Sequence, residues 1–305
     1  MIKSMSKQDS FALLPGHGRY DYVPINRRPG YRWPSGAGLA FYVALNVEQY
    51  AFGEGLVEDL VPGMSEPDIL NASWREYGTR IGAWRLLDLL KSLELPATIL
   101  LNSAVGIHCP DLVKAMCDAG HEIAAHGRTN SESQAGYSEK AERELINHVA
   151  DSIAAVAGTP PRGWLGPWLA ETPLTPDLLQ ENGYQYVLDY CADDQPIWLK
   201  TRNGRILSIP YSQEINDSAA IMGRFVGADQ FADMIIDQVD EMLEQSTEQA
   251  LVFGLAIHAN IVGQPFRLRQ LRRALRHVAE LSDRIWITRA GDIADEIMTH
   301  PERAV

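Results

Sequence analysis

Residues 39–47 read LAFYVALNV, an apolar run with the length of a β-strand, and Glu48 follows this run directly. Because the run contains several valine and aromatic residues, it predicts a buried strand. A second run of this kind, LVFGLAIH at residues 251–258, ends at His258. Each run therefore leads from a predicted buried strand to a polar side chain that can take part in chemistry.

Around these two runs, apolar segments of strand length alternate with segments of helical periodicity. Further strands are predicted at residues 97–101, 121–126, 162–166, 184–189, 205–210 and 284–288. Helices are predicted at residues 80–93, 110–119, 138–157, 175–182, 228–245 and 265–280. This alternation is typical of βαβ units in an α/β fold with a mostly parallel sheet. A count of about seven parallel strands favours a deformed (β/α) barrel over a doubly wound sheet.

The whole chain, residues 1–305, is predicted to form one barrel domain, since α/β barrels often reach this length. Residues 1–36 are rich in glycine, proline, arginine and aromatic residues, and they predict an extended arm that lies on the barrel. Glycine, proline and acidic residues at 53–73 predict a loop there, and its length is typical of loops with a function. The arm carries Tyr20, Tyr22, Tyr31 and Trp33, which a monomer must cover, so a homo-oligomer of two or four chains is expected.

The composition restricts the partners and the compartment. A formal net charge of -13 and a pI near 5.1 argue against nucleic acid and against anionic membranes as partners. No apolar run has the roughly 18 residues of a membrane span, and the first 15 residues lack the pattern of a signal peptide. Three cysteines without a close pair favour a reducing compartment. A cytoplasmic protein with a small-molecule substrate is therefore expected.

Polar residues follow the predicted strands, at the positions where parallel α/β folds place their functional groups. They are Asn46, Glu48, Asn102, His126, Asn130, Trp164, Asp189, Asp193, Asp194, Asn216, Asp217 and His258. Each also has an ordinary interpretation: Glu48 as a solvated carboxylate, His126 as a core histidine, Trp164 as a packing residue. Because so many fall at strand ends, we expect the fold to gather them at one mouth of the barrel.

Hydrolysis of a C–N bond requires a base for water, a donor for the oxyanion and an acid for the leaving nitrogen. Glu48 can activate water, and His126 and His258 can donate protons. Asp189, or Asp193 as second candidate, can orient one imidazole. Serine-hydrolase, HExxH, GxGxxG and P-loop motifs are absent from the sequence, which disfavours those classes of enzyme.

The order of these segments resembles the NodB-homology polysaccharide deacetylases, most closely the subgroup with cofactor-free allantoinases and cyclic imide hydrolases. The resemblance covers about residues 18–296. The matching segments are NVEQ at 46–49, GHEIAAHG at 120–127, GW at 163–164, IH at 257–258 and REYGTRIGAWR at 75–85. The last of these segments adds Arg80 to the candidate substrate-binding residues, which are Asn46, Asn130, Trp164, Asp193, Asn216 and Arg80.

The resemblance also shows where this chain departs from the deacetylase pattern. Such deacetylases carry two adjacent aspartates, a base and a metal ligand, where this chain has Glu48 and Gln49. They carry two ligand histidines where this chain has His126 and Asn130, and an arginine where it has Leu165. Glu48 and His126 thus offer at most a weak two-ligand zinc site, so we expect no metal and no other cofactor.

The resemblance and the residues together predict a hydrolase of non-peptide C–N bonds in a small cyclic or linear amide, imide or ureide. The expected catalytic residues are Glu48, His126, His258 and Asp189. Two alternatives stay open at this point. One is an N-deacetylase of a sugar or oligosaccharide, and the other is an inactive module that binds carbohydrate or another ligand.

Overall fold

The computed structural model describes residues 16–305, and nine strands of this part form one curled sheet. The strands are β1 (Leu39–Val47), β2 (Ala97–Leu101), β3 (Glu122–Ala125), β4 (Gly163–Trp164), β5 (Tyr186–Val187), β6 (Ile197–Thr201), β7 (Gly204–Ser208), β8 (Leu251–His258) and β9 (Trp286–Thr288). Their order is β6-β7-β5-β4-β3-β2-β1-β8, and β9 pairs with β1. Every pair is parallel except the β6–β7 hairpin. The predicted α/β class and deformed barrel are confirmed.

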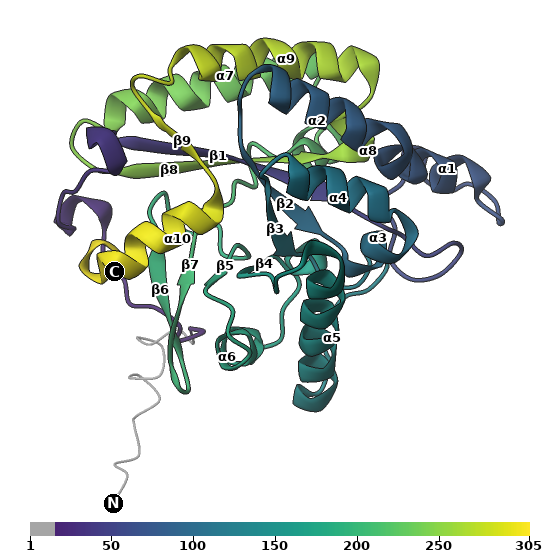
Figure 1. The fold of residues 1–305 in the computed structure, drawn as a ribbon, viewed down its shortest axis with the longest axis horizontal. Coiled ribbons are helices and arrows are strands. Elements are labelled where there is room, and N and C mark those ends of the chain that lie inside the picture. The colour runs from purple at the N-terminus through teal and green to yellow at the C-terminus, as the bar shows by residue number, and fades with distance from the viewer. Residues whose placement is uncertain (1–15) are drawn as a thin grey trace, which may run out of the picture.

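Helices cover the outside of the curled sheet (Figure 1). They are α1 (Ile69–Tyr77), α2 (Ala83–Ser92), α3 (Ser103–His108), α4 (Pro110–Asp118), α5 (Glu139–Ala157), α6 (Thr175–Glu181), α7 (Ala228–Gln245), α8 (Ala259–Val262), α9 (Pro265–Glu280) and α10 (Ala290–Thr299). Helices α7 and α9 lie side by side along β8 and β1, whereas α10 lies at the other side of these strands (Figure 1).

Strand β1 is fully buried, and its side chains alternate between two cores. Leu39, Phe41, Val43, Leu45 and Val47 join the core beneath the outer helices. Ala40, Tyr42 and Ala44 join a second core inside the curled sheet, to which α10 also contributes. Strand β8 alternates in the same way, because successive side chains of a strand point to opposite faces. Every second residue of these strands therefore lies on the inner face of the sheet. A polar residue at the end of a strand faces inward when it continues this alternation.

The edge strands β8 and β6 do not pair with each other, and connecting segments fill the space between them. The backbone N–H of Val252 donates to the carbonyl of Asp194 at 2.8 Å, and that of Ser212 donates to Gly254 at 3.2 Å. Asn216 forms a parallel bridge with Ala256 of β8. The segment after β7 thus runs along β8 and brings residues 211–217 to the inside of the barrel.

Residues 16–36 lie against the barrel, as predicted for the arm, while its first 15 residues lie outside the described part. Arg28 forms an ion pair with Asp193 at 2.5 Å, and the indole N–H of Trp33 donates to the carbonyl of Leu251 at 2.8 Å. Trp33 is buried within the same chain, so no second chain is needed to cover it, contrary to the expectation. Tyr22, in contrast, is 90% exposed.

Several element boundaries differ from those predicted. The predicted loop at 53–73 already contains the start of α1, whose first turn is capped by the side chain of Asp68. A π-helical segment, Gly78–Gly82, precedes α2. The sequence analysis missed β6, α3, α8 and α10. Among the helices of residues 16–305, none is long and apolar enough for a membrane span. The three cysteines of the described residues, Cys109, Cys117 and Cys191, form no disulfide bond.

Candidate active site

Three strands end near one another with a polar residue on the inner face of the sheet. Asn46 lies in β1 opposite His258 of β8 in the parallel register. His126 follows β3 directly, two positions along the sheet from β1. Each of the three follows, by two residues, an alanine of the inner core. The period-2 alternation of strands therefore points all three side chains toward the inside of the barrel.

A cavity of about 180 Å³ lies at this end of the strands. Six predicted residues line it: Asn46, Glu48, His126, Asn130, Asn216 and His258. Within it, Oε1 of Glu48 lies 3.6 Å from Nε2 of His258 and 3.4 Å from Nε2 of His126. The structure thus brings Glu48, His126 and His258 together in one pocket, whereas Trp164, which was expected to join them, does not line it.

The carboxylate of Glu48 is buried and accepts hydrogen bonds at both oxygens. The side-chain amide of Asn130 donates to Oε1 at 2.7 Å, and the hydroxyl of Tyr50 donates to Oε2 at 2.7 Å. Burial by itself raises the pKa of Glu48. The positive charge of His258 and the hydrogen bonds from His126 and Tyr50 outweigh burial and hold the pKa below its usual value. Glu48 is therefore a carboxylate at neutral pH.

His258 is held by a carboxylate that lies on the segment after β7. Its Nδ1 lies 2.6 Å from Oδ1 of Asp217, and its backbone N–H donates to Oδ2 at 2.9 Å. Burial opposes the charge on the imidazole, but Asp217 and Glu48 raise the pKa of His258 to about 9. At neutral pH the ring is therefore an imidazolium, with Nδ1–H bound to Asp217 and Nε2–H directed into the cavity.

The carboxylate predicted to orient His258 was Asp189, and this prediction is wrong. Oδ1 of Asp189 accepts the backbone N–H of Gly166 at 2.8 Å instead. Burial and the nearby Glu171 raise the pKa of Asp189 well above its usual value. Asp189 follows a strand residue of the outer core, and this alternation turns it away from the cavity.

The second candidate, Asp193, does not lie at the site either. Both of its carboxylate oxygens bind the guanidinium of Arg28 in the arm, at 2.5 and 2.7 Å. Asp193 thus fastens the arm to the barrel and is unavailable to His258 or to a substrate in the cavity.

His126 is fixed in one tautomer by the main chain. Its Nδ1 lies 2.9 Å from the carbonyl oxygen of Leu165, and a carbonyl only accepts, so Nδ1 carries a proton. Nε2 then faces Glu48, 3.4 Å from its Oε1. The chain turns directly afterwards at Gly127, whose φ of +61° and contact with Pro167 leave no room for a side chain.

Trp164 and Arg80 were predicted to bind substrate, and the structure places neither at the cavity. Trp164 is fully buried in the outer core, where it packs edge-on against Tyr184 at 5.6 Å between ring centroids. Arg80 is exposed. A different tryptophan, Trp168, lines the cavity and donates its indole N–H to the carbonyl of Asn130 at 2.8 Å.

Part of the chain that forms this site matches a known protein family. Residues 76–187 match the family model described as polysaccharide deacetylase. The matched segment includes His126, Asn130 and Trp164, whereas Glu48 and His258 lie on either side of it.

Full-length comparisons extend the match to most of the chain. The crystal structure of PuuE allantoinase superposes with a TM-score of 0.80 at 27% identity, covering 92% of this chain and 99% of that one. A Schizosaccharomyces pombe protein named as a polysaccharide deacetylase is 25% identical over 315 residues, which cover 92% of this chain and 96% of the relative. A Helicobacter pylori peptidoglycan deacetylase is 23% identical over 274 residues, 79% of this chain and 91% of the relative. The resemblance stated from the sequence is confirmed.

The donor set of this site does not fit a catalytic zinc ion. Between residues 16 and 305, no group of three histidine, cysteine or acidic side chains is arranged to hold a metal. Next to Glu48 and His126, Asn130 directs its amide N–H at the carboxylate. Gln49 lines a separate small cavity of about 20 Å³. Because catalytic zinc usually takes three ligands of the former types, we derive no step through a metal.

Several residues of the site were missed by the sequence analysis. Tyr50 lies two residues after Glu48, so a continuation of the strand alternation would have placed it on the same side. The hydroxyl of Tyr211 accepts a hydrogen bond from Asn46 at 3.0 Å. Glu58 lines the cavity from the loop before α1, and Trp168 has a positive φ of 63°. No periodicity marks the last two, since loop conformation alone positions them.

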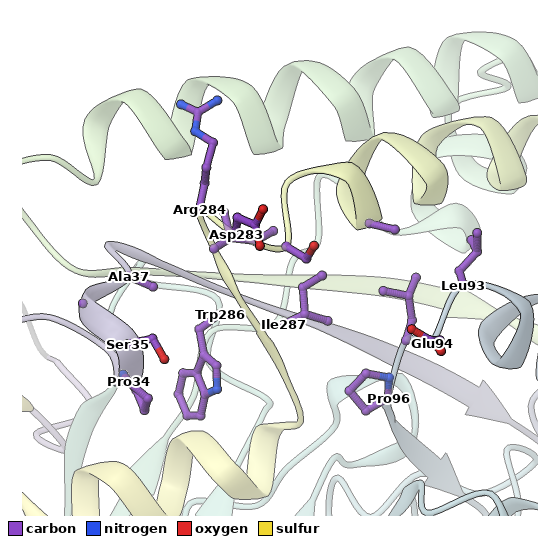
Figure 2. A pocket seen from close by; sticks show the side chains of 15 residues that line it. Pro34, Ser35, Ala37, Leu93, Glu94, Pro96, Asp283, Arg284, Trp286 and Ile287 are labelled. Atoms are coloured by element: carbon purple, nitrogen blue, oxygen red, sulfur yellow. The ribbon is translucent and has the colours of Figure 1, made fainter.

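A larger cavity of about 440 Å³ lies at the opposite end of the strands (Figure 2). Residues that precede β1 and β2, such as Pro34 and Pro96, line it together with the start of β9 at Trp286. In Figure 2, Arg284 extends away from this cavity toward the helices. Because parallel α/β barrels carry their chemistry at the carboxyl ends of the strands, the smaller cavity is the candidate active site.

Proposed function

We propose that this chain hydrolyses a non-peptide C–N bond of a small amide, imide or ureide, with Glu48 as base and His258 as acid. The observation that carries the proposal is the pairing of a carboxylate with an imidazolium, 3.6 Å apart, in one buried cavity. The broad class agrees with the relatives, since deacetylases and allantoinase hydrolyse C–N bonds outside peptides.

In the proposed reaction, a water molecule in the cavity attacks the carbonyl carbon and gives a proton to Glu48. Nε2 of His126 lies 3.4 Å from Oε1 of this carboxylate and lines the cavity beside it. The C–N bond then breaks, and Nε2–H of His258 supplies a proton to the departing nitrogen. The proton held by Glu48 then returns to Nε2 of His258, 3.6 Å away, which restores both groups. The products are a carboxylic acid and an amine or amide, on one molecule when the substrate is a ring. General acid–base groups of this kind typically contribute about 10²–10⁴-fold each.

The size of the cavity supports a small substrate. Its volume of about 180 Å³ is below the roughly 300–1,000 Å³ typical of pockets for drug-sized ligands. An oligosaccharide would extend well beyond it. The residues that line it also provide no three-ligand metal site for activating water, so a more reactive carbonyl is favoured. Imide and ureide carbonyls are more reactive than that of a plain acetamide, and we propose them as substrates in a reaction without a tightly held metal.

A second candidate is an N-deacetylase of acetylated sugars, which the name of the Helicobacter pylori relative favours. It requires the cavity to open toward a longer polymer and the same residues to cleave an unactivated acetamide. An inactive binding module is disfavoured by Glu48 and His258, since binding alone requires neither a buried base nor an acid.

A hydrolysis screen with purified full-length protein distinguishes these candidates. The substrates are succinimide, hydantoin, allantoin, N-acetylglucosamine and chitotetraose, with the products followed by proton NMR. The proposal expects ring opening of at least one imide or ureide and no release of acetate. The His258→Ala variant serves as control for a contaminating hydrolase. Acetate release without ring opening would assign the chain to the deacetylases, and no turnover of any substrate would favour the binding module.

A further inference from the structure

The loop between β1 and α1 places one buried carboxyl group at the cavity. Most residues from 52 to 66 are exposed, but Glu58 and Asp59 are turned inward. The guanidinium of buried Arg75 holds this turn, because one nitrogen bonds to the carbonyl of Glu58 at 2.9 Å and to Oδ1 of Asp59 at 3.0 Å. Glu58 then lines the same cavity as Glu48 and His258.

The carboxyl group of Glu58 is oriented but only partly satisfied. Its Oε1 accepts the hydroxyl proton of Ser218 at 2.5 Å. Within residues 16–305, no donor reaches Oε2 and no salt bridge involves this group. Burial raises the pKa of Glu58 above its usual value, although the charge of His258 and the hydrogen bond from Ser218 oppose this. Oε2 is therefore free to accept a hydrogen bond from a ligand in the cavity that Glu58 lines.

Gln213 brings the complementary group to this cavity. It lines the cavity together with Glu58, and its side-chain nitrogen is buried without a hydrogen-bond partner in the described part of the chain. A buried polar atom without a partner costs roughly 1–3 kcal/mol, so such atoms in a pocket mark where a ligand is expected to bond. Glu58 therefore offers an acceptor and Gln213 a donor, and neither takes part in the proposed bond cleavage.

We infer that Glu58 determines substrate specificity by accepting a ring N–H that is not part of the scissile bond, while Gln213 donates to a carbonyl of the same ring. This inference rests on the proposed function and narrows it to ureides over simple imides. A simple imide such as succinimide has one N–H, at the bond that is cleaved. A ureide ring such as hydantoin has a second N–H, which only a group outside the catalytic pair can recognise.

The test compares hydantoin with 1-methylhydantoin, which lacks the second N–H. Calorimetric dissociation constants are measured on full-length protein with His258→Ala, so that the bound ring persists. We expect hydantoin to bind roughly 10–100-fold more tightly, because 1-methylhydantoin leaves the acceptor of Glu58 without a hydrogen bond. Adding Glu58→Ala should reduce this preference to within about threefold, and Glu58→Gln should retain part of it, because an acceptor oxygen remains.

Glu54 provides the matched control, since it is an exposed carboxylate on the same loop. Glu54→Ala should leave the preference for hydantoin unchanged, and circular dichroism confirms that each variant is folded. A preference that survives Glu58→Ala, or no measurable binding of either ring, overturns the inference. If the parent protein hydrolyses hydantoin but the preference for hydantoin does not depend on Glu58, the inference is refuted and the proposed function stands. A Glu58-dependent preference without any hydrolysis supports the inference and refutes the proposed function.

Discussion

Asp217 binds His258 twice, through its ring and through its main chain. Oδ1 of the aspartate lies 2.6 Å from Nδ1 of the imidazole, and Oδ2 accepts the backbone N–H of the same histidine at 2.9 Å. One carboxylate thus fixes the end of β8, the tautomer of the ring and its charge. Because Nδ1 is occupied, Nε2 is the atom that faces the cavity and Glu48.

Replacing Asp217 with Asn should move the alkaline limb of the pH–activity profile to lower pH. A general acid must be protonated, so activity falls as pH rises through the pKa of His258, about 9 in the parent. Without the aspartate charge that pKa falls, so the limb shifts down, whereas the backbone hydrogen bond persists. The measurement is kcat/KM between pH 5 and 10 for both proteins. An unshifted alkaline limb contradicts the assignment.

The same pair makes folding stability depend on pH. The pKa of His258 is raised above its value in an unfolded chain, so its contribution is complete below about pH 6.5 and is lost as pH rises through about 9. Asp217→Asn should flatten this dependence in urea unfolding between pH 6 and 9.5. The surface pair His277–Asp240, at 2.7 Å, offers the matched control, and Asp240→Asn should change the dependence little.

Replacing His258 with Ala should lower turnover by roughly 10²–10⁴-fold, the usual range for a general acid. His277→Ala, at a half-exposed site on α9, should leave turnover within about twofold, because surface substitutions rarely act over distance. Steady-state kinetics on the substrate found in the screen provide the measurement. Turnover of His258→Ala within a few-fold of the parent removes His258 from the mechanism.

Prolonged chelation should leave activity unchanged. The amide N–H of Asn130, directed at Glu48, takes a place that a zinc site would give to a ligand. Elemental analysis of active protein is followed by dialysis against a strong chelator and a second assay. Stoichiometric zinc, together with an activity loss that added zinc restores, contradicts a metal-independent reaction and favours the deacetylase candidate.

The chain should form an oligomer of two or four copies. The loop before α1 and the first turn of that helix expose seven large apolar side chains, each at least 40% accessible: Phe52, Leu56, Leu60, Val61, Met64, Ile69 and Leu70. Several large apolar side chains exposed on one segment favour an interface that covers them. Light scattering at micromolar concentration should give a multiple of 33.9 kDa, and the mass of one chain would refute the prediction.

The sequence predicts the sheet and its buried strands because apolar runs of strand length alternate with helical segments. It does not predict β6, which lies in a hairpin at the edge, because an edge strand buries less and lacks a long apolar run. It also misses α10, whose inner face packs against the inside of the sheet. In the described part of the chain, connecting segments lie along β8 and close the barrel. No hydrophobic pattern in those segments predicts that they do so.

A position at the end of a strand does not by itself predict that a residue lines the cavity. The side chain must also lie on the inner face of the sheet. Asn46 and His258 continue the inner face of their strands, and both line the cavity. Trp164 ends β4 on the outer face and packs in the core instead. When both faces of a strand are apolar, the sequence does not distinguish inner from outer. Asp217 was among the collected polar residues, but its pairing with His258 depends on a backbone path that periodicity does not encode.

Glu48 carries the central claim, because the proposed reaction requires its carboxylate to take a proton from water. Glu48→Gln keeps the size of the side chain and an acceptor for Tyr50 while it removes the base. The measurement is kcat of this variant on the ring that the parent opens, with the dissociation constant of the same ring. The account predicts that kcat falls by roughly 10²–10⁴-fold while binding changes little. A kcat within a few-fold of the parent would contradict it.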